Sequence, residues 1–172
     1  MKKIYFIGTL HGRTPKNDLE SMLNKLNPDQ LILEIQQTDI ENKNLNSYPD
    51  EMVFGHNWAE KNNVSIYGMD TAFSEIADDK DEEDNQKVIA LQDKIITNHD
   101  WKDFNKEEYL KLLEIPEEKE LIDEEKSNLR EQEMLKNMLS NAILKGTIVV
   151  LTGAGHLAFF EKELPEAIFP LR

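Results

Sequence analysis

Short continuous runs of apolar residues alternate along this chain with longer segments in which apolar residues recur at helical spacing. Continuous runs, unlike alternating ones, are typical of strands that are covered on both faces, as in a parallel sheet. Four runs rich in Ile, Val, Leu or Tyr therefore predict strands, at Lys3–Ile7, Gln30–Ile35, Val64–Met69 and Thr147–Thr152.

The segments between these runs predict helices. They span Asn17–Leu26, about Asp50–Asn62, Asn85–Asn98 and Glu117–Lys145. Pro116 suits the start of the last helix, and Gly146 suits its end. Strands that alternate with helices in this way indicate an α/β fold, with a mostly parallel central sheet flanked by helices.

Length and charge indicate how the chain is organised. With 172 residues and a mass of 20.0 kDa, residues 1–172 fit a single domain. The formal net charge is −14, and most of it falls between residues 75 and 134, where twenty-one acidic side chains outnumber nine basic ones. We expect residues 78–134, approximately, to form an acidic helical insertion or cap before the last main strand.

The excess of acidic residues and the lack of cysteine exclude several classes of partner and of catalytic chemistry. A charge of −14 repels nucleic-acid phosphates and anionic lipid headgroups, so we expect neither nucleic acid nor a membrane as a partner. The sequence has no cysteine, which excludes disulfides, thiolate nucleophiles and thiolate metal sites and fits a reducing compartment. Because the longest apolar run is also too short to span a bilayer, we expect a cytoplasmic protein.

Each predicted strand leads into a polar or ionisable group. The first strand runs into Gly8-Thr9-Leu10-His11 and the fourth into Gly153-Ala154-Gly155-His156, so the ending Gly-x-x-His occurs twice. The second strand delivers Glu34 and the third delivers Asp70. In a parallel sheet these four ionisable residues meet at the carboxyl edge, where open α/β sheets bind ligands. An imidazole at that edge can act as a general base, a proton donor or a metal ligand.

Glu34 ends an otherwise apolar strand and should have a partner, because an unpaired buried carboxylate is costly. The partner is either a metal shared with the two histidines or the guanidinium of Arg130. Asp70 has a competing structural role as the N-cap of a helix that starts near Thr71. Glycines at the strand ends allow tight turns and close approach of the backbone to a bound cofactor, and the candidates are Gly8, Gly153 and Gly155.

Four motifs spread over the whole chain carry a family resemblance. They are Phe6-Ile7-Gly8-Thr9-Leu10-His11-Gly12, Pro28-Asp29-Gln30-Leu31-Ile32-Leu33-Glu34, Asn128-Leu129-Arg130-Glu131-Gln132-Glu133-Met134 and Val149-Val150-Leu151-Thr152-Gly153-Ala154-Gly155-His156-Leu157. Together they resemble the TraB/PrgY and TIKI group and, more distantly, erythromycin esterases and ChaN-type haem-binding proteins. Glu131 departs from the pattern, since it stands where members of the group often have Asn or Asp.

The resemblance implies a metal-dependent, peptidase-like hydrolase. In that interpretation His11, Glu34 and His156 hold a divalent ion such as Mn²⁺, Co²⁺ or Zn²⁺ or activate water, and Arg130 steadies the carboxylate or a developing oxyanion. The erythromycin-esterase-like relatives imply instead that histidine and glutamate perform acid–base hydrolysis without a metal. The residue types suit both mechanisms, and the catalytic set is the same: His11, Glu34, Arg130 and His156.

Two interpretations without turnover stay open. A binding protein of the same fold would hold a peptide or another small-molecule ligand, or haem with His11, His156 or Tyr67 as axial ligands. The other is an inert relative whose acidic helices bind a basic partner, and only the acidic middle of the sequence supports it. The sequence gives no indication of the oligomeric state.

Overall fold

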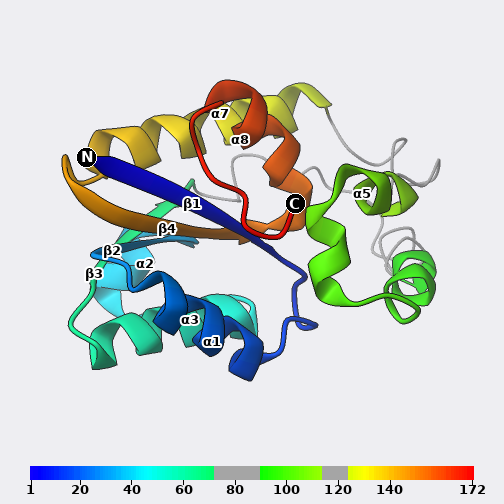
Figure 1. Ribbon diagram of the computed structural model, residues 1–172, viewed down its shortest axis with the longest axis horizontal. Helices are drawn as coiled ribbons and strands as arrows, with labels where there is room; N and C mark the ends of the chain where they lie inside the picture. The colour runs from blue at the N-terminus through cyan, green and yellow to red at the C-terminus, as the bar shows by residue number, and fades with distance from the viewer. Residues whose placement is uncertain (72–89, 114–123) are drawn as a thin grey trace.

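The computed structural model describes residues 1–71, 90–113 and 124–172, and a sheet of four parallel strands runs through its centre (Figure 1). The strands are β1 (Lys2–Thr9), β2 (Gln30–Gln36), β3 (Ser65–Asp70) and β4 (Gly146–Gly153), in the spatial order β1-β4-β2-β3. This confirms the predicted α/β fold with a parallel sheet. Each observed strand overlaps its predicted run and differs from it by two residues at most at either end.

The strands separate toward their carboxyl ends. β1 and β4 stay paired from Lys2 and Gly146 to Thr9 and Gly153. In contrast, the pairing of β2 with β4 ends at Leu33, and its pairing with β3 shifts in register between Leu33 and Gln36. The residue at the point of separation is Glu34. The end of the sheet therefore opens where the sequence places its ionisable groups.

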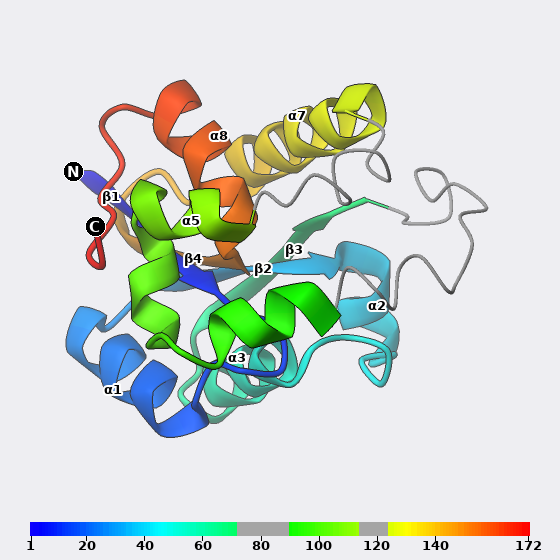
Figure 2. The same ribbon diagram turned by 90° about the vertical axis from the view of Figure 1, so that its right-hand side faces the viewer.

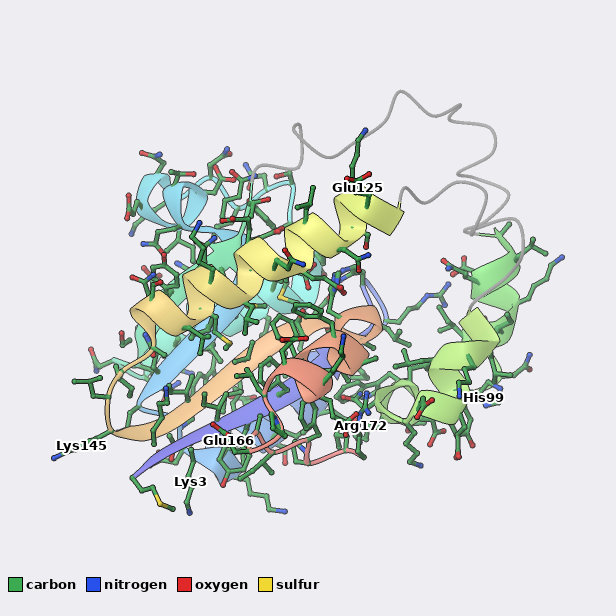
Figure 3. The ribbon with its side chains drawn as sticks, turned by 90° about the horizontal axis from the view of Figure 1, so that it is seen from above. Lys3, His99, Glu125, Lys145, Glu166 and Arg172 are labelled. Atoms are coloured by element: carbon green, nitrogen blue, oxygen red, sulfur yellow. The ribbon has the colours of Figure 1, made fainter. Side chains whose placement is uncertain are left out.

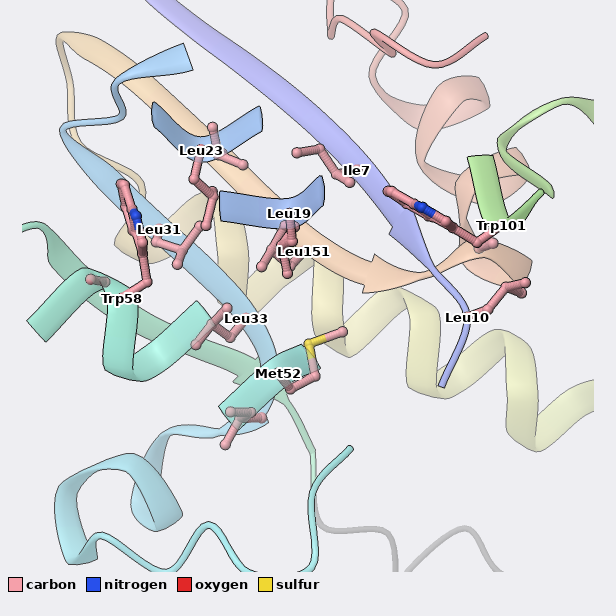
Figure 4. Close-up of a cluster of buried hydrophobic side chains, with 14 of the residues drawn as sticks. Ile7, Leu10, Leu19, Leu23, Leu31, Leu33, Met52, Trp58, Trp101 and Leu151 are labelled. Atoms are coloured by element: carbon pink, nitrogen blue, oxygen red, sulfur yellow. The ribbon is translucent and has the colours of Figure 1, made fainter. Parts of the chain in front are cut away.

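One face of the sheet is covered by α1 (Lys16–Leu26) and α3 (Asp50–Lys61), which lie below the strands in Figure 1. Their apolar side chains meet those of alternate strand residues, as the close-up in Figure 4 shows. The buried residues of this face include Leu19, Leu23, Met52, Trp58, Ile7, Leu31, Leu33 and Leu151.

The opposite face is covered by α7 (Glu124–Asn141) and α8 (Leu157–Glu163). Seen from above, α7 passes over the strands (Figure 3). Its buried residues Met134 and Met138 join Phe160 of α8 against Phe6 and Val150 of the sheet. Because both faces are buried, the strands are apolar on both sides, which explains their continuous rather than alternating sequence pattern.

The middle of the chain is packed against the end of β1. Residues 90–96 are helical, and η2 (Trp101–Asn105) and α5 (Glu107–Leu113) follow. Figure 2 shows these segments together beside the sheet. Trp101 and Phe104 are buried in the cluster that α1 and α3 form with the sheet. The described part of the predicted acidic cap thus contributes to the core, and the run Asp78–Asp84 lies outside the described residues.

The outer edge of β1 is closed by two other parts of the chain. The backbone N–H of Phe6 donates to the carbonyl of Ile168 at 2.9 Å, and the N–H of Ile168 donates to the carbonyl of Ile4 at 2.8 Å. Further along the strand, the buried Asn105 accepts from the N–H of Gly8 at 2.8 Å and donates to its carbonyl at 2.9 Å. Because these backbone groups have partners, this part of the edge does not offer them to another strand.

Helix ends and short helices account for the differences from the predicted pattern. The last long helix ends at Asn141 and not at Lys145, because the buried Gln30 holds its end: the amide Nε2 donates to the carbonyl of Asn141 at 2.9 Å, and Oε1 accepts from the N–H of Ile143 at 3.0 Å. The sequence pattern missed α2 (Gln37–Asn42), η2, α5, η3 (Ala154–His156) and α8. In the ranges that the structure describes, no helix has both the length and the apolar character needed to cross a membrane.

Candidate functional site

His11 lies in the loop after β1 and is held by a buried glutamate of α3. Its Nδ1 is 2.7 Å from Oε1 of Glu51, and the other oxygen of Glu51 accepts from the backbone N–H of Gly12 at 3.1 Å. Glu51 is only 1% exposed, whereas the side chain of His11 is 51% exposed. The carboxylate therefore fixes the orientation of an imidazole that solvent can reach.

This contact decides which nitrogen of His11 is available. A carboxylate accepts hydrogen bonds, so Nδ1 carries the proton in the neutral ring and Nε2 keeps its lone pair. A Cβ built on Gly153 would lie 3.4 Å from Nε2, which places this nitrogen at the carboxyl end of β4. The hydrogen bond that His11 Nδ1 donates to Glu51 raises the pKa of His11 above 6.5 and outweighs the lowering by burial.

Glu34 is a buried carboxylate with partners on both oxygens. Oε2 accepts from the Thr152 hydroxyl at 2.7 Å and from the backbone N–H of Gly153 at 2.6 Å, and Oε1 accepts from Arg130 Nη2 at 2.8 Å. Burial raises the pKa of Glu34, but the contact with His156, the charge of Arg130 and the Gly153 N–H outweigh burial and hold the pKa below its usual range. Of the two partners predicted for Glu34, the structure supports Arg130.

Arg130 joins two strands through their terminal carboxylates. In addition to Glu34 on β2, it binds Asp70 at the end of β3, with Nε 3.0 Å from Oδ1 and Nη2 2.8 Å from Oδ2. Asp70 also accepts from the backbone N–H of Thr71 at 2.8 Å. Asp70 is therefore a partner of the guanidinium, and the helix predicted to start near Thr71 falls outside the described residues.

His156 is held between two carboxylates. Its Nδ1 is 2.8 Å from Oε1 of Glu131, and its Nε2 is 3.4 Å from Oε1 of Glu34. Burial lowers the pKa of His156, but these two carboxylates raise it more, to about 9. The ring is therefore a cation at neutral pH. Glu131, which departs from the family pattern, is the residue that fixes this imidazole.

A pocket of about 410 Å³ opens beside this cluster. Three of the predicted catalytic residues, His11, Glu34 and Arg130, line it, whereas His156 is not among the lining residues and contacts Glu34 instead. The other lining residues come mainly from the end of β2 and the segment that leads to α3: Gln36, Asp39, Ser47, Tyr48, Pro49 and Asp70. The two ends of the chain thus contribute to one site at the carboxyl edge of the sheet.

The three glycines have different surroundings. An added Cβ at Gly153 would reach His11 Nε2, Glu34 Oε2 at 3.5 Å and His156 Cδ2 at 3.6 Å, so this glycine leaves space among the ionisable groups. An added Cβ at Gly8 would lie 2.9 Å from Cα of Ala154 and would also overlap the side chain of Leu157. Packing therefore explains glycine at position 8. Nothing lies within 4 Å of the same position at Gly155.

The donor atoms do not fit the metal centre implied by the resemblance. Both oxygens of Glu34 receive hydrogen bonds, and both nitrogens of His156 face carboxylate oxygens. A metal needs carboxylate lone pairs and a neutral imidazole. Accordingly, the described residues contain no group of three or more His, Asp or Glu side chains that could hold an ion.

The sequence pattern did not single out Glu51, which the structure places against His11. Glu51 reads in the sequence as an ordinary acidic residue in the first turn of an amphipathic helix, and only the packing of α3 against the sheet buries it below His11. The closeness of Gly55 to that sheet, where an added Cβ would lie 2.8 Å from Leu151, shows how near the helix approaches. Tyr67, considered as a haem ligand, packs instead among the apolar residues between α7 and the sheet.

Comparisons of this chain with protein-family models, with curated proteins and with solved structures found no significant match.

Proposed function

We propose that this protein is a hydrolase of amide or ester bonds that works by acid–base catalysis without a metal. The observation that carries the proposal is the pair His11 and Glu51: a buried carboxylate fixes the tautomer of an accessible imidazole that lines a pocket. Such a pairing prepares histidine to accept a proton from water. The proposal keeps the hydrolytic reaction expected from the resemblance and replaces its metal with His11.

In the proposed reaction Nε2 of His11 removes a proton from a water molecule in the pocket. The water oxygen forms a bond to the carbonyl carbon of the substrate, and the carbonyl oxygen takes up the electron pair of its double bond. When the carbon–nitrogen or carbon–oxygen bond breaks, the protonated His11 returns its proton to the leaving group. Glu51 stabilises the imidazolium that forms between these two steps.

The other predicted residues prepare the site. Arg130 brings a positive charge to the pocket wall, where negative charge develops on the carbonyl oxygen. Glu34 fixes Arg130 and the backbone of Gly153 in one arrangement, and His156 acts as a positioning residue through its contact with Glu34. Peptides are the proposed substrates, in line with the peptidase-like activity that the TraB/PrgY and TIKI resemblance implies.

The proposal is tested with a fluorogenic panel of peptides and esters and three forms of the protein. The parent should cleave members of the panel, and His11→Gln should lose at least about 100-fold in kcat/KM, the usual contribution of a general base. His99→Gln is the matched control, because His99 is exposed and lies on the segment beside the sheet (Figure 3). Equal rates for the two variants would contradict the proposal.

Treatment with a chelator tests the metal-free mechanism separately. After incubation with excess EDTA and gel filtration, the parent should keep its full rate, since none of the proposed steps uses an ion. Loss of activity that returns with added Mn²⁺, Co²⁺ or Zn²⁺ would restore the metal centre and contradict this part of the proposal.

A further inference from the structure

One wall of the pocket carries the carboxylate of Asp39, which forms no ion pair with any cation among the described residues. Asp39, in the first turn of α2, accepts from the Tyr48 hydroxyl at 2.6 Å and from the Asn44 amide at 3.3 Å. Both donors are neutral. In the ranges that the structure describes, no Lys, Arg or His side chain lies within ion-pair distance of Asp39, and its charge therefore remains at the pocket.

The remaining charges of the site do not offset this carboxylate. Arg130 and, when protonated, His11 are the cations that line the pocket. Arg130 is already bound to Glu34 and Asp70, and His11 is already bound to Glu51. His156 likewise lies between Glu34 and Glu131. The carboxylates of the site thus outnumber its cations, and the whole chain carries a net charge of −14. A pocket with this balance repels anions and concentrates cations.

The same wall also has apolar surface beside the carboxylate. Tyr48 and Pro49 line the pocket next to Asp39 and give it an aromatic and an aliphatic surface. The Tyr48 hydroxyl donates to Asp39 and accepts from the backbone N–H of Gln36 at 3.2 Å, which fixes the ring in place. An apolar stem that ends in a positive charge, as in lysine and arginine, matches such a surface followed by a carboxylate.

We infer that the substrate of this site is a peptide with a basic side chain, lysine or arginine, that docks against Asp39 while the scissile bond lies at His11. The inference rests on the proposed hydrolase function and adds its substrate class. Asp39 is then the specificity-determining residue, and acidic peptides are excluded by the charge of the pocket.

The test uses matched peptides that differ at one position. A position-scanning set of capped fluorogenic peptides carries arginine, citrulline or glutamate on either side of the cleaved bond and neutral residues elsewhere. Citrulline has nearly the shape of arginine without its charge. At low salt kcat/KM for the arginine peptide should exceed that for citrulline by about tenfold or more, the usual value of a hydrogen bond between charged groups. The ratio should fall as NaCl is added.

Two variants test whether Asp39 causes the preference for arginine over citrulline. Asp39→Asn should bring the arginine-to-citrulline ratio close to one, whereas Glu41→Gln, an exposed acidic residue on the same helix, should leave the ratio as in the parent. Thermal unfolding of each variant checks that both fold. An arginine preference that survives in Asp39→Asn would contradict the assignment.

A binding measurement separates the two proposals. If peptides are cleaved with no preference for arginine, the substrate inference is wrong and the hydrolase stands. If neither the peptides nor the esters of the panel are cleaved, the hydrolase is wrong, and fluorescence polarisation of the same peptides with the His11→Gln variant then decides the inference. About tenfold tighter binding of the arginine peptide supports it, and equal binding overturns it.

Discussion

The imidazole of His11 and the carboxylate of Glu51 meet at 2.7 Å, although forty residues separate them in the chain. The loop after β1 supplies the histidine and the first turn of α3 supplies the glutamate. Because the glutamate is buried and also accepts from Gly12, the contact fixes the loop as well as the ring. The proposed general base therefore depends on a residue that does not itself reach the substrate.

Replacing Glu51 by Gln tests that dependence. The glutamine amide would donate to Nδ1, so the proton of the neutral ring would move to Nε2 and leave it without a lone pair. We expect kcat to fall by roughly 100-fold. The pKa of His11 should also fall, because Glu51 is the main cause of its increase, and the acid limb of the pH–rate profile should move to lower pH.

Asp50→Asn is the control for this variant. Asp50 is the neighbouring residue of α3, exposed and paired with Lys16 on the surface. Its replacement should leave both kcat and the acid limb as in the parent. If Glu51→Gln behaves like Asp50→Asn, the carboxylate has no part in the reaction.

Alanine substitutions at Gly153 and Gly8 distinguish a glycine that leaves space among the site residues from one that core packing requires. Gly153→Ala places a methyl at ordinary contact distance from His11 Nε2, and the backbone φ of −56° suits alanine. We expect unfolding free energy to stay within about 1 kcal/mol of the parent while the rate drops at least about tenfold, because the methyl occupies space beside the base.

Gly8→Ala should show the opposite balance. There the methyl would meet the backbone of Ala154 and the Leu157 side chain, so the end of β1 would have to move. Overpacking of this kind costs about 1 to 3 kcal/mol, measured by urea unfolding. A Gly153→Ala protein with full activity would show that the space among His11, Glu34 and His156 is not used.

Arg130→Lys tests the bridge between β2 and β3. Lysine keeps the charge, but its single ammonium does not reproduce the two parallel contacts with Asp70 together with the contact to Glu34. We expect a loss of about 2 kcal/mol in unfolding free energy, less than the 3 to 5 kcal/mol typical of removing a buried partner altogether. Lys136→Arg is a suitable surface control, since Lys136 and its partner Glu133 are both exposed to solvent. Unchanged stability in Arg130→Lys would contradict the role of this bridge.

The pKa of His156 makes a specific prediction for stability against pH. The folded-state pKa is about 9 and the ordinary value is 6.5, so folding favours the protonated ring. The stabilisation is fully present below pH 6.5 and is lost as the pH rises through about 9. Urea unfolding at pH 6 and pH 9.5 should show a loss on the order of 3 kcal/mol in the parent.

Glu131→Gln isolates this effect. The variant lacks the Glu131 carboxylate, one of the two that raise the pKa of His156. Its loss of stability over the same pH interval should therefore be smaller than in the parent. The comparison removes contributions from other groups, because His11 and the surface charges titrate in both proteins. An equal pH dependence in the two proteins would show that the ion pair does not contribute.

The parallel sheet, and the placement of His11, Glu34, Asp70 and His156 at its carboxyl edge, followed from local pattern. Apolar runs mark the strands because burial on both faces leaves no polar alternation, and a parallel sheet brings all strand ends to one edge. The cost of an unpaired buried carboxylate left two candidate partners for Glu34, a shared metal and Arg130, and the structure shows the contact with Arg130.

Other features depend on contacts that no local pattern encodes. Glu51 becomes a partner of His11 only through the packing of α3, and α7 ends at Asn141 because Gln30, from a distant strand, binds its end. The acidic composition of the middle segment suggested a solvated cap, yet two of its aromatic residues, Trp101 and Phe104, belong to the core. Such long-range relationships outweigh composition.

The proposed reaction requires an unprotonated Nε2 on His11, held in that form by Glu51. Two-bond ¹H–¹⁵N correlation spectra of the histidine side chains test this requirement without any substrate. We expect the Nδ1–H tautomer for the neutral ring of His11 and a titration midpoint above 6.5 that falls in Glu51→Gln. A neutral ring protonated on Nε2, or a midpoint that Glu51→Gln leaves unchanged, would contradict it.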